Sequence, residues 1–189
     1  WSTRGKSVHV PVLIQEVLQM LRPRSGGVYL DGTLGAGGYS EAILNESGPD
    51  GRVIGLDLDS TAVERAGKRL EEFGDRFKAV HGGFQDAVSI LESLGILAVD
   101  GAVLDLGLSS DQLDDPTRGF SFRWDSPLDM RFDTDAGQSV LEYLQTVSAK
   151  KLEEILATYG EERYCKKLSR ALVDAGNRGE LATTDDLVR

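Results

Sequence analysis

The chain has 189 residues, of which 40% are hydrophobic, and a formal net charge of −10. This length supports one domain, or one domain with a small insertion, and the charge argues against a protein that coats nucleic acid by bulk electrostatics. One cysteine and two histidines exclude an internal disulfide and lead us to expect no metal site, and no apolar run is long enough to span a membrane. We therefore expect a cytoplasmic protein.

Hydrophobic periodicity predicts alternating helices and strands up to residue 105. A first helix is expected over residues 11–21. Strands are expected over 28–31, 53–57, 77–80 and 100–105, with helices between them over 40–46, 61–73 and 86–94. Thr61 and Glu64 have the spacing of a capping box for the middle one of these helices. The alternation predicts an α/β fold of parallel, right-handed βαβ units.

The pattern changes after Leu106. Residues 111–136 are rich in Asp, Arg, Pro and Gly and show no sustained period, which indicates a long functional loop. Helical spacing returns near 138–146, 149–158 and 162–175. We therefore divide the chain into a core over residues 1–110 and a helical module over residues 111–189.

A glycine turn follows the first expected strand, in the segment Asp31-Gly-Thr-Leu-Gly-Ala-Gly-Gly38. Glycines at a strand-to-helix turn let a nucleotide approach the backbone and the free N–H groups of the helix. Asp57, which ends the second strand, is placed to bind the hydroxyls of a ribose. Both a nicotinamide dinucleotide and S-adenosylmethionine satisfy this pattern.

Two residues favour S-adenosylmethionine. Ser40 stands where the dinucleotide pattern requires a third glycine. Asp31 is an acid placed to meet the cationic amino-acid end of S-adenosylmethionine, directly or through water. The spacing from Asp31 to Gly37 is close to the methyltransferase form D-x-G-x-G-x-G, with Thr33 replacing one glycine.

Seven motifs in order along the chain together resemble one family, the ribosomal RNA small-subunit methyltransferase H family, also called MraW. They are His9-Val-Pro-Val-Leu13, Asp31-Gly-Thr-Leu-Gly-Ala-Gly-Gly38, Asp105-Leu-Gly-Leu-Ser-Ser110, Gln112-Leu-Asp114, Arg118-Gly-Phe-Ser-Phe122, Pro127-Leu-Asp-Met-Arg131 and Tyr159-Gly-Glu-Glu162. The resemblance implies a class I methyltransferase fold, in which we expect the four strands in the order 3-2-1-4, with S-adenosylmethionine as cofactor. It also implies that N4 of a cytosine in 16S ribosomal RNA, free or in the small ribosomal subunit, is the acceptor.

The resemblance also implies cofactor contacts. They fall at Asp31, Gly35, Gly37, Gly38, Tyr39, Asp57, Phe84, Asp105 and Gln112. Phe84 is expected near the adenine, and the residues from Gly37 to Tyr39 beside the methionine part. The family usually has histidine at position 39 and glycine at position 126, where this chain has Tyr39 and Ser126.

Methyl transfer to an exocyclic amine requires the nitrogen to be aligned with the methyl group and to lose a proton after attack. Asp105, Ser109 and Ser110 follow the fourth strand and are our candidates for orienting the cofactor or the amine. The alternative for the serines is that they cap a helix after the strand. The sequence assigns no general base.

Exposed bases in RNA are commonly held by aromatic stacking and by arginine. These residue types alternate at Arg118, Phe120, Phe122 and Trp124, although the aromatic residues could instead anchor the loop to a core. Arg131 is a further candidate, from its place in a family motif. Arg163, Lys166, Lys167 and Arg170 form a basic stripe at helical spacing, opposite Tyr164, Leu168 and Leu172, and from it we select Arg163 and Lys167 as RNA contacts.

Class I methyltransferases need about seven strands, so we expect the remaining strands beyond residue 189. Two alternative functions stay open: a nicotinamide-dependent oxidoreductase, and an RNA-binding or ribosome-assembly module that does not turn over. A homodimer is compatible with all of these.

Overall fold

The computed structural model describes residues 13–189 and divides into two compact units, one reaching Gly107 and the other spanning Leu108–Arg189. Each unit is described by itself. The division lies close to the domain boundary expected after residue 110. Most of the motif His9–Leu13, and the start of the helix expected over residues 11–21, lie outside the described residues.

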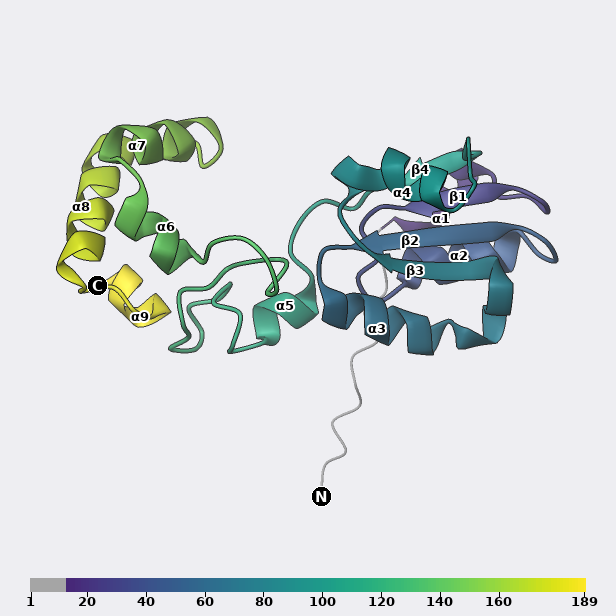
Figure 1. Ribbon diagram of the computed structural model, residues 1–189, viewed down its shortest axis with the longest axis horizontal. Helices are drawn as coiled ribbons and strands as arrows, with labels where there is room; N and C mark the ends of the chain where they lie inside the picture. The colour runs from purple at the N-terminus through teal and green to yellow at the C-terminus, as the bar shows by residue number, and fades with distance from the viewer. Residues whose placement is uncertain (1–12) are drawn as a thin grey trace, which may run out of the picture. The chain divides into compact units, whose positions relative to one another are not determined.

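The first unit is a parallel sheet with helices on both faces (Figure 1). Its strands are β1 (Val28–Asp31), β2 (Arg52–Asp57), β3 (Phe77–His81) and β4 (Gly101–Val103), and they lie in the order β3-β2-β1-β4. The predicted α/β class and strand order are therefore confirmed. β4 is shorter than expected.

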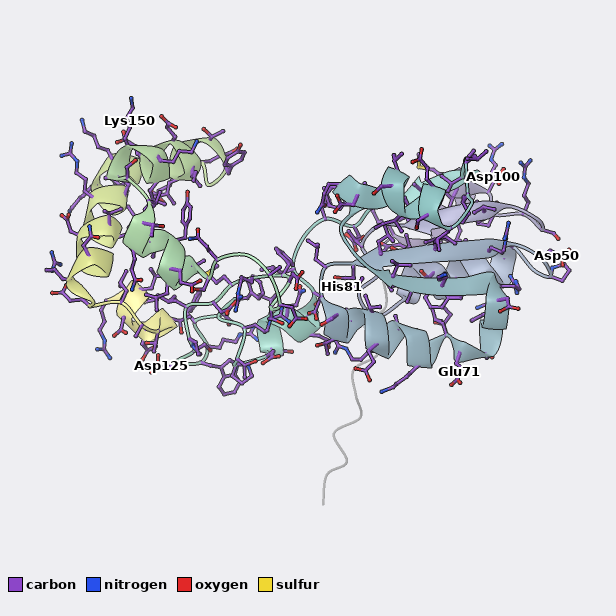
Figure 2. All side chains as sticks on the ribbon, viewed as in Figure 1. Asp50, Glu71, His81, Asp100, Asp125 and Lys150 are labelled. Atoms are coloured by element: carbon purple, nitrogen blue, oxygen red, sulfur yellow. The ribbon has the colours of Figure 1, made fainter. Side chains whose placement is uncertain are left out.

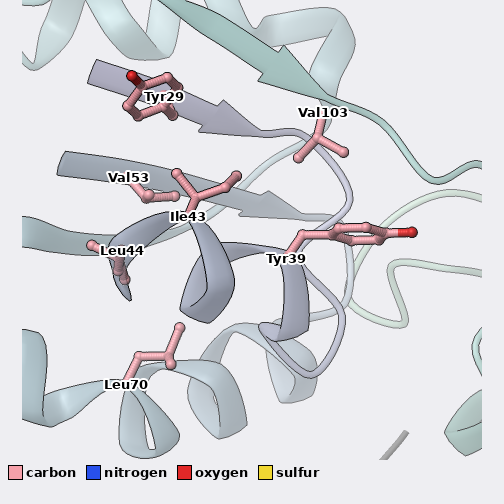
Figure 3. Packing of buried hydrophobic residues seen from close by; sticks show 7 residues of the cluster. All are labelled: Tyr29, Tyr39, Ile43, Leu44, Val53, Leu70 and Val103. Atoms are coloured by element: carbon pink, nitrogen blue, oxygen red, sulfur yellow. The ribbon is translucent and has the colours of Figure 1, made fainter. Parts of the chain in front are cut away.

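Alternate residues of the strands face opposite layers of helices. Tyr29, Val53 and Val103 pack with Ile43 and Leu44 in one cluster, shown in Figure 3. That layer contains α1 (Ile14–Leu21), α2 (Gly38–Glu46) and the end of α3 (Ser60–Arg69). On the other face, the neighbouring strand residues pack against α4 (Ala87–Ser93).

Two short 3₁₀ helices, η1 (Glu71–Arg76) and η2 (Phe84–Asp86), flank β3. The capping box expected at Thr61 is wrong. Asp59 is the N-cap of α3, and its carboxylate accepts a hydrogen bond from the Thr61 N–H at 2.9 Å. An acid two residues earlier therefore satisfies the helix start, and α3 ends at Arg69 before η1 begins.

The second unit is helical. It contains α5 (Ser110–Asp114), α6 (Val140–Thr146), α7 (Ala149–Thr158), α8 (Cys165–Arg178) and α9 (Thr184–Val188). Its core forms around Leu128, Leu144, Leu152 and Leu181. Leu128 belongs to the long loop between α5 and α6, so this loop is anchored in the core at that point.

Two hydrogen bonds hold the same loop to the start of α9. The Thr184 N–H donates to the Ser126 carbonyl at 2.8 Å, and the Ser126 N–H donates to the Thr184 hydroxyl at 3.0 Å. Ser126 is buried, so the position where the family usually has glycine joins the loop to α9. Within residues 13–189, no helix has the length and apolar character needed to cross a membrane.

Candidate cofactor site and RNA-binding residues

The carboxyl ends of parallel strands are where open α/β sheets bind ligands. Figure 2 shows Asp50 and Asp100 at the end of the sheet where β2 and β4 begin, and His81 at the opposite end, where β3 stops. Asp31, Asp57 and Asp105 lie at this second, carboxyl edge. The edge therefore gathers three of the acids that the sequence singles out.

The glycine turn connects β1 to α2 and has the conformation that only glycine adopts readily. Gly35 and Gly37 have φ values of 49° and 82°. A Cβ at Gly35 would meet only the Thr33 carbonyl, at 3.9 Å, so open space lies beside the backbone there. A Cβ at Gly37 would lie 3.0 Å from the Leu70 side chain, so Gly37 is needed for packing against α3. The open space beside Gly35 leaves the backbone accessible to a ligand, whereas Gly37 has a structural reason of its own.

Asp57 joins the end of β2 to this turn. One carboxylate oxygen accepts from the Gly35 N–H at 2.7 Å, and the other accepts from the Asp59 N–H at 2.9 Å. Each carboxylate oxygen can accept a second hydrogen bond, so binding ribose hydroxyls remains compatible with these contacts. Asp57 thus fits the expected role and also holds the turn.

Arg69 holds the turn from α3. Its guanidinium donates to the Ala36 carbonyl at 3.0 Å and pairs with Glu41 of α2. Sequence analysis did not single out this residue, because nothing in the pattern of α3 distinguishes it from a solvent-exposed arginine.

Asp31 is fully buried. Its carboxylate accepts from the Ser40 hydroxyl at 2.8 Å and from the Thr33 N–H at 3.3 Å. Burial raises the pKa of Asp31 to about 6, while the hydrogen bonds from Ser40 and Thr33 oppose that rise. Asp31 therefore stabilises the start of α2, and direct contact with a ligand is not compatible with this burial. Ser40, which the sequence analysis noted only because it replaces a glycine, is the hydrogen-bond partner of Asp31.

Asp105 follows β4 and is exposed, and its N–H donates to the Thr33 hydroxyl at 2.7 Å. Tyr39, in the first turn of α2, is 8% exposed and packs in the core. Burial and the negative charges of Asp105 and Asp31 raise the pKa of Tyr39, whose hydroxyl is hydrogen-bonded to Asp105. Tyr39 therefore acts through its ring and hydroxyl as well as through its backbone.

Phe84 lies at the start of η2 and is 45% exposed. A Cβ at Gly32 would meet the Leu104 side chain at 2.4 Å and Cβ of Phe84 at 3.1 Å, so these two side chains flank Gly32 closely. They give the carboxyl edge an exposed apolar surface suited to a flat base such as adenine. No cluster of His, Cys, Asp or Glu able to hold a metal occurs in the described part of the chain.

Ser109, Ser110 and Gln112 belong to the second unit. Ser109 and Gln112 form a capping box: the Ser109 hydroxyl accepts from the Gln112 N–H at 3.1 Å, and the Gln112 side chain accepts from the Ser109 N–H at 3.0 Å. The alternative that Ser109 caps a helix is confirmed. We withdraw Ser109 as a catalytic candidate, because its hydroxyl is engaged at the start of α5, whereas Ser110 remains exposed.

Two of the expected RNA-binding arginines are engaged within the loop. Arg118 is buried and donates to the carbonyls of Arg131 and Phe132 at 2.8 and 2.9 Å. The Arg131 side chain pairs with Asp129, with its closest contact at 2.7 Å. Both arginines therefore stabilise the loop. We remove Arg118 from the RNA-binding set because it is buried, whereas Arg131, which is partly exposed, stays a prediction.

The aromatic residues of the loop separate into two groups. Phe120 packs against Phe132, with ring centroids 5.4 Å apart, and lies beside the Arg118 guanidinium. Phe122 and Trp124 are 80% and 51% exposed. The anchoring alternative therefore describes Phe120, while Phe122 and Trp124 remain available for stacking.

The basic stripe is exposed at Arg163, Lys166, Lys167 and Arg170. Arg163 precedes α8, which begins at Cys165, later than expected. Tyr164, on the side of the helical pattern opposite the stripe, is 69% exposed. Tyr159 is 83% exposed, and the sequence analysis proposed neither tyrosine as an RNA contact.

Comparisons with known proteins agree with these features. The model of the MraW methylase family matches residues 6–189. Ribosomal RNA small subunit methyltransferase H of Trichlorobacter lovleyi is 49% identical over 93% of this chain and 56% of its own length. The protein of the same name from Syntrophotalea carbinolica is 46% identical over 98% of this chain and 59% of its own. The chain thus spans somewhat more than half the length of these curated relatives.

Among solved structures, an S-adenosylmethionine-dependent methyltransferase from Aquifex aeolicus is 23% identical over 36% of this chain and 37% of its own, with a TM-score of 0.33. A likeness this low adds no argument. The family model and the curated relatives cover nearly the whole chain and show that it belongs to the MraW methylase family.

Proposed function

We propose that the protein transfers a methyl group from S-adenosylmethionine to N4 of a cytosine in small-subunit ribosomal RNA. The observation that carries the proposal is the family match over residues 6–189, together with relatives named for small-subunit ribosomal RNA methylation. We further propose a cytoplasmic location, with which a ribosomal substrate is compatible.

The carboxyl edge of the sheet supports the cofactor assignment. Bound there, S-adenosylmethionine supplies an electrophilic methyl group on a sulfonium. Asp57 would accept hydrogen bonds from the ribose, and Phe84 would pack against the adenine. Gly35 provides backbone access, and the start of α2 after Gly37 would favour the carboxylate of the cofactor through the helix dipole.

In the transfer, the amine nitrogen would take the methyl group as the carbon–sulfur bond breaks with its electrons going to sulfur, and the nitrogen would release a proton to solvent. Alignment of the nitrogen with the methyl group is the larger contribution expected from the protein. We assign Asp105, which is exposed at the carboxyl edge, to orienting the cofactor or the amine. We assign no residue as general base.

The second unit supports RNA binding. Phe122 and Trp124 present exposed rings for stacking, and Arg163 and Lys167 present exposed cations for phosphates. Because the whole chain is acidic, these contacts act locally.

The test is mass spectrometry of nucleosides after incubation with S-adenosylmethionine and small-subunit RNA transcribed in vitro, either free or reconstituted into subunits. We expect N4-methylcytidine from at least one substrate, and loss of the product with Asp57→Ala. Binding of S-adenosylhomocysteine without methylation of either substrate would favour the assembly module. Binding of NADH without S-adenosylhomocysteine would favour the oxidoreductase.

A further inference from the structure

Thr33 extends the pairing of β1 with β4 beyond the last residue of β4. The regular ladder ends where the Gly32 N–H donates to the Val103 carbonyl at 3.0 Å. Two residues farther along, the Asp105 N–H donates to the Thr33 hydroxyl at 2.7 Å. A side-chain oxygen thus accepts the hydrogen bond that a backbone carbonyl would accept in a continuing strand.

This bond acts where the chain leaves regular structure. Leu104, Asp105 and Leu106 are all exposed after β4 ends. A peptide N–H at such a position exchanges its bond with water readily unless a protein acceptor holds it. A hydroxyl at position 33 therefore restricts the backbone of Asp105, whereas glycine at that position of the D-x-G-x-G-x-G pattern has no atom to do so.

Tyr39 holds the side chain of Asp105, whose backbone N–H is bound by Thr33. Its ring packs in the core, and Figure 3 shows its hydroxyl projecting away from the strands, past Val103. A tyrosine hydroxyl is protonated at neutral pH, so this one donates to the Asp105 carboxylate. The backbone and the side chain of Asp105 are therefore both tied to the turn between β1 and α2.

We propose that Thr33 is a positioning residue that, together with Tyr39, fixes Asp105 at the carboxyl edge of the sheet. The proposal rests on the proposed function in one respect, since it takes Asp105 to face the cofactor or the acceptor amine. The glycine turn and Asp105 then form one connected unit, in which the loop that contacts the cofactor also sets the position of Asp105.

Hydrogen exchange at the Asp105 amide tests the bond without any activity assay. The matched variants are Thr33→Val, which keeps the branched shape and removes the hydroxyl, and Thr33→Ser, which keeps the hydroxyl. We expect the Asp105 amide to exchange about tenfold faster in Thr33→Val, as for a lost hydrogen bond, and at nearly the wild-type rate in Thr33→Ser. The exchange rate of the Gly32 amide should be the same in both variants as in wild type, and it reports whether β1 and β4 remain paired. Equal exchange at Asp105 in Thr33→Val and wild type would overturn the proposal.

Steady-state methyl transfer tests the consequence. We expect Thr33→Val and Tyr39→Phe to lower kcat about tenfold with a much smaller change in KM for S-adenosylmethionine, and Thr33→Ser to restore most of kcat. Faster exchange at Asp105 with an unchanged kcat would overturn the positioning role. If wild-type protein methylates nothing, the proposed function fails, while the exchange measurement still decides whether Thr33 holds Asp105.

Discussion

Asp31 gives the most quantitative prediction, because its carboxylate is fully buried at the start of α2. Burial raises its pKa from 3.8 to about 6. Each pKa unit corresponds to about 1.36 kcal/mol, so the ionised carboxylate costs the folded state about 3 kcal/mol relative to the unfolded chain.

The sign follows from which state binds the proton more tightly. Below about pH 3, Asp31 is protonated in both states and contributes no pH dependence. Between about pH 4 and pH 6 the unfolded chain loses this proton while the folded chain keeps it, so the free energy of unfolding falls as the pH rises. Above about pH 6 both states are ionised and the contribution is constant.

Asp31→Asn removes the titration while keeping an oxygen that can accept from Ser40. We expect the free energy of unfolding of wild type, minus that of Asp31→Asn, to fall by about 3 kcal/mol between pH 3 and pH 7. Urea unfolding followed by circular dichroism at several pH values measures this difference, and the subtraction removes the other titrating groups. The free energy of unfolding of Ser40→Ala should fall by more than that of wild type over the same pH range, because the ionised Asp31 carboxylate loses a hydrogen-bond donor. A difference that stays flat across this pH range would refute the reasoning.

Three further predictions concern the turn and the RNA-binding residues. Arg69→Ala should weaken S-adenosylhomocysteine binding by about 1 kcal/mol in calorimetry, because the Ala36 carbonyl loses its donor; unchanged affinity would exclude this role. Phe122→Ala and Trp124→Ala should each weaken binding of single-stranded RNA by about 1–3 kcal/mol without lowering the melting temperature, whereas Phe120→Ala should lower the melting temperature. Lys167→Ala should reduce the slope of the logarithm of the RNA-binding constant against the logarithm of salt concentration by about one. An identical slope would remove Lys167 from the interface.

The fold was predictable because its signals are periodic. The place of the glycine turn and the position of Asp57 at the end of β2 follow from alternating hydrophobic segments, whereas the strand order follows from the family resemblance. The partners of Asp31 were not predictable in the same way. The ligand motifs specify only whether position 40 is glycine, so they give no partner for a serine there. The hydrogen bond from Ser40 to Asp31 depends on the first turn of α2.

Residues in the long loop were the hardest to assign. Arg118 and Arg131 have the composition of an RNA-binding segment, but an irregular loop has its own carbonyls and acids to satisfy, and it engages both arginines. Ser109 had a recognisable signal, since Gln112 follows at the spacing of a capping box. At Thr61 the same spacing misled, because Asp59 stands closer to the helix start.

Calorimetric titration with S-adenosylhomocysteine and, separately, with NADH tests most directly whether the glycine turn and Asp57 form an S-adenosylmethionine site. We expect S-adenosylhomocysteine to bind, NADH not to bind, and Asp57→Ala to weaken the binding of S-adenosylhomocysteine by about 1–3 kcal/mol while the protein remains folded by circular dichroism. Binding of NADH without binding of S-adenosylhomocysteine, or an unchanged affinity in the folded Asp57→Ala variant, would contradict the assignment.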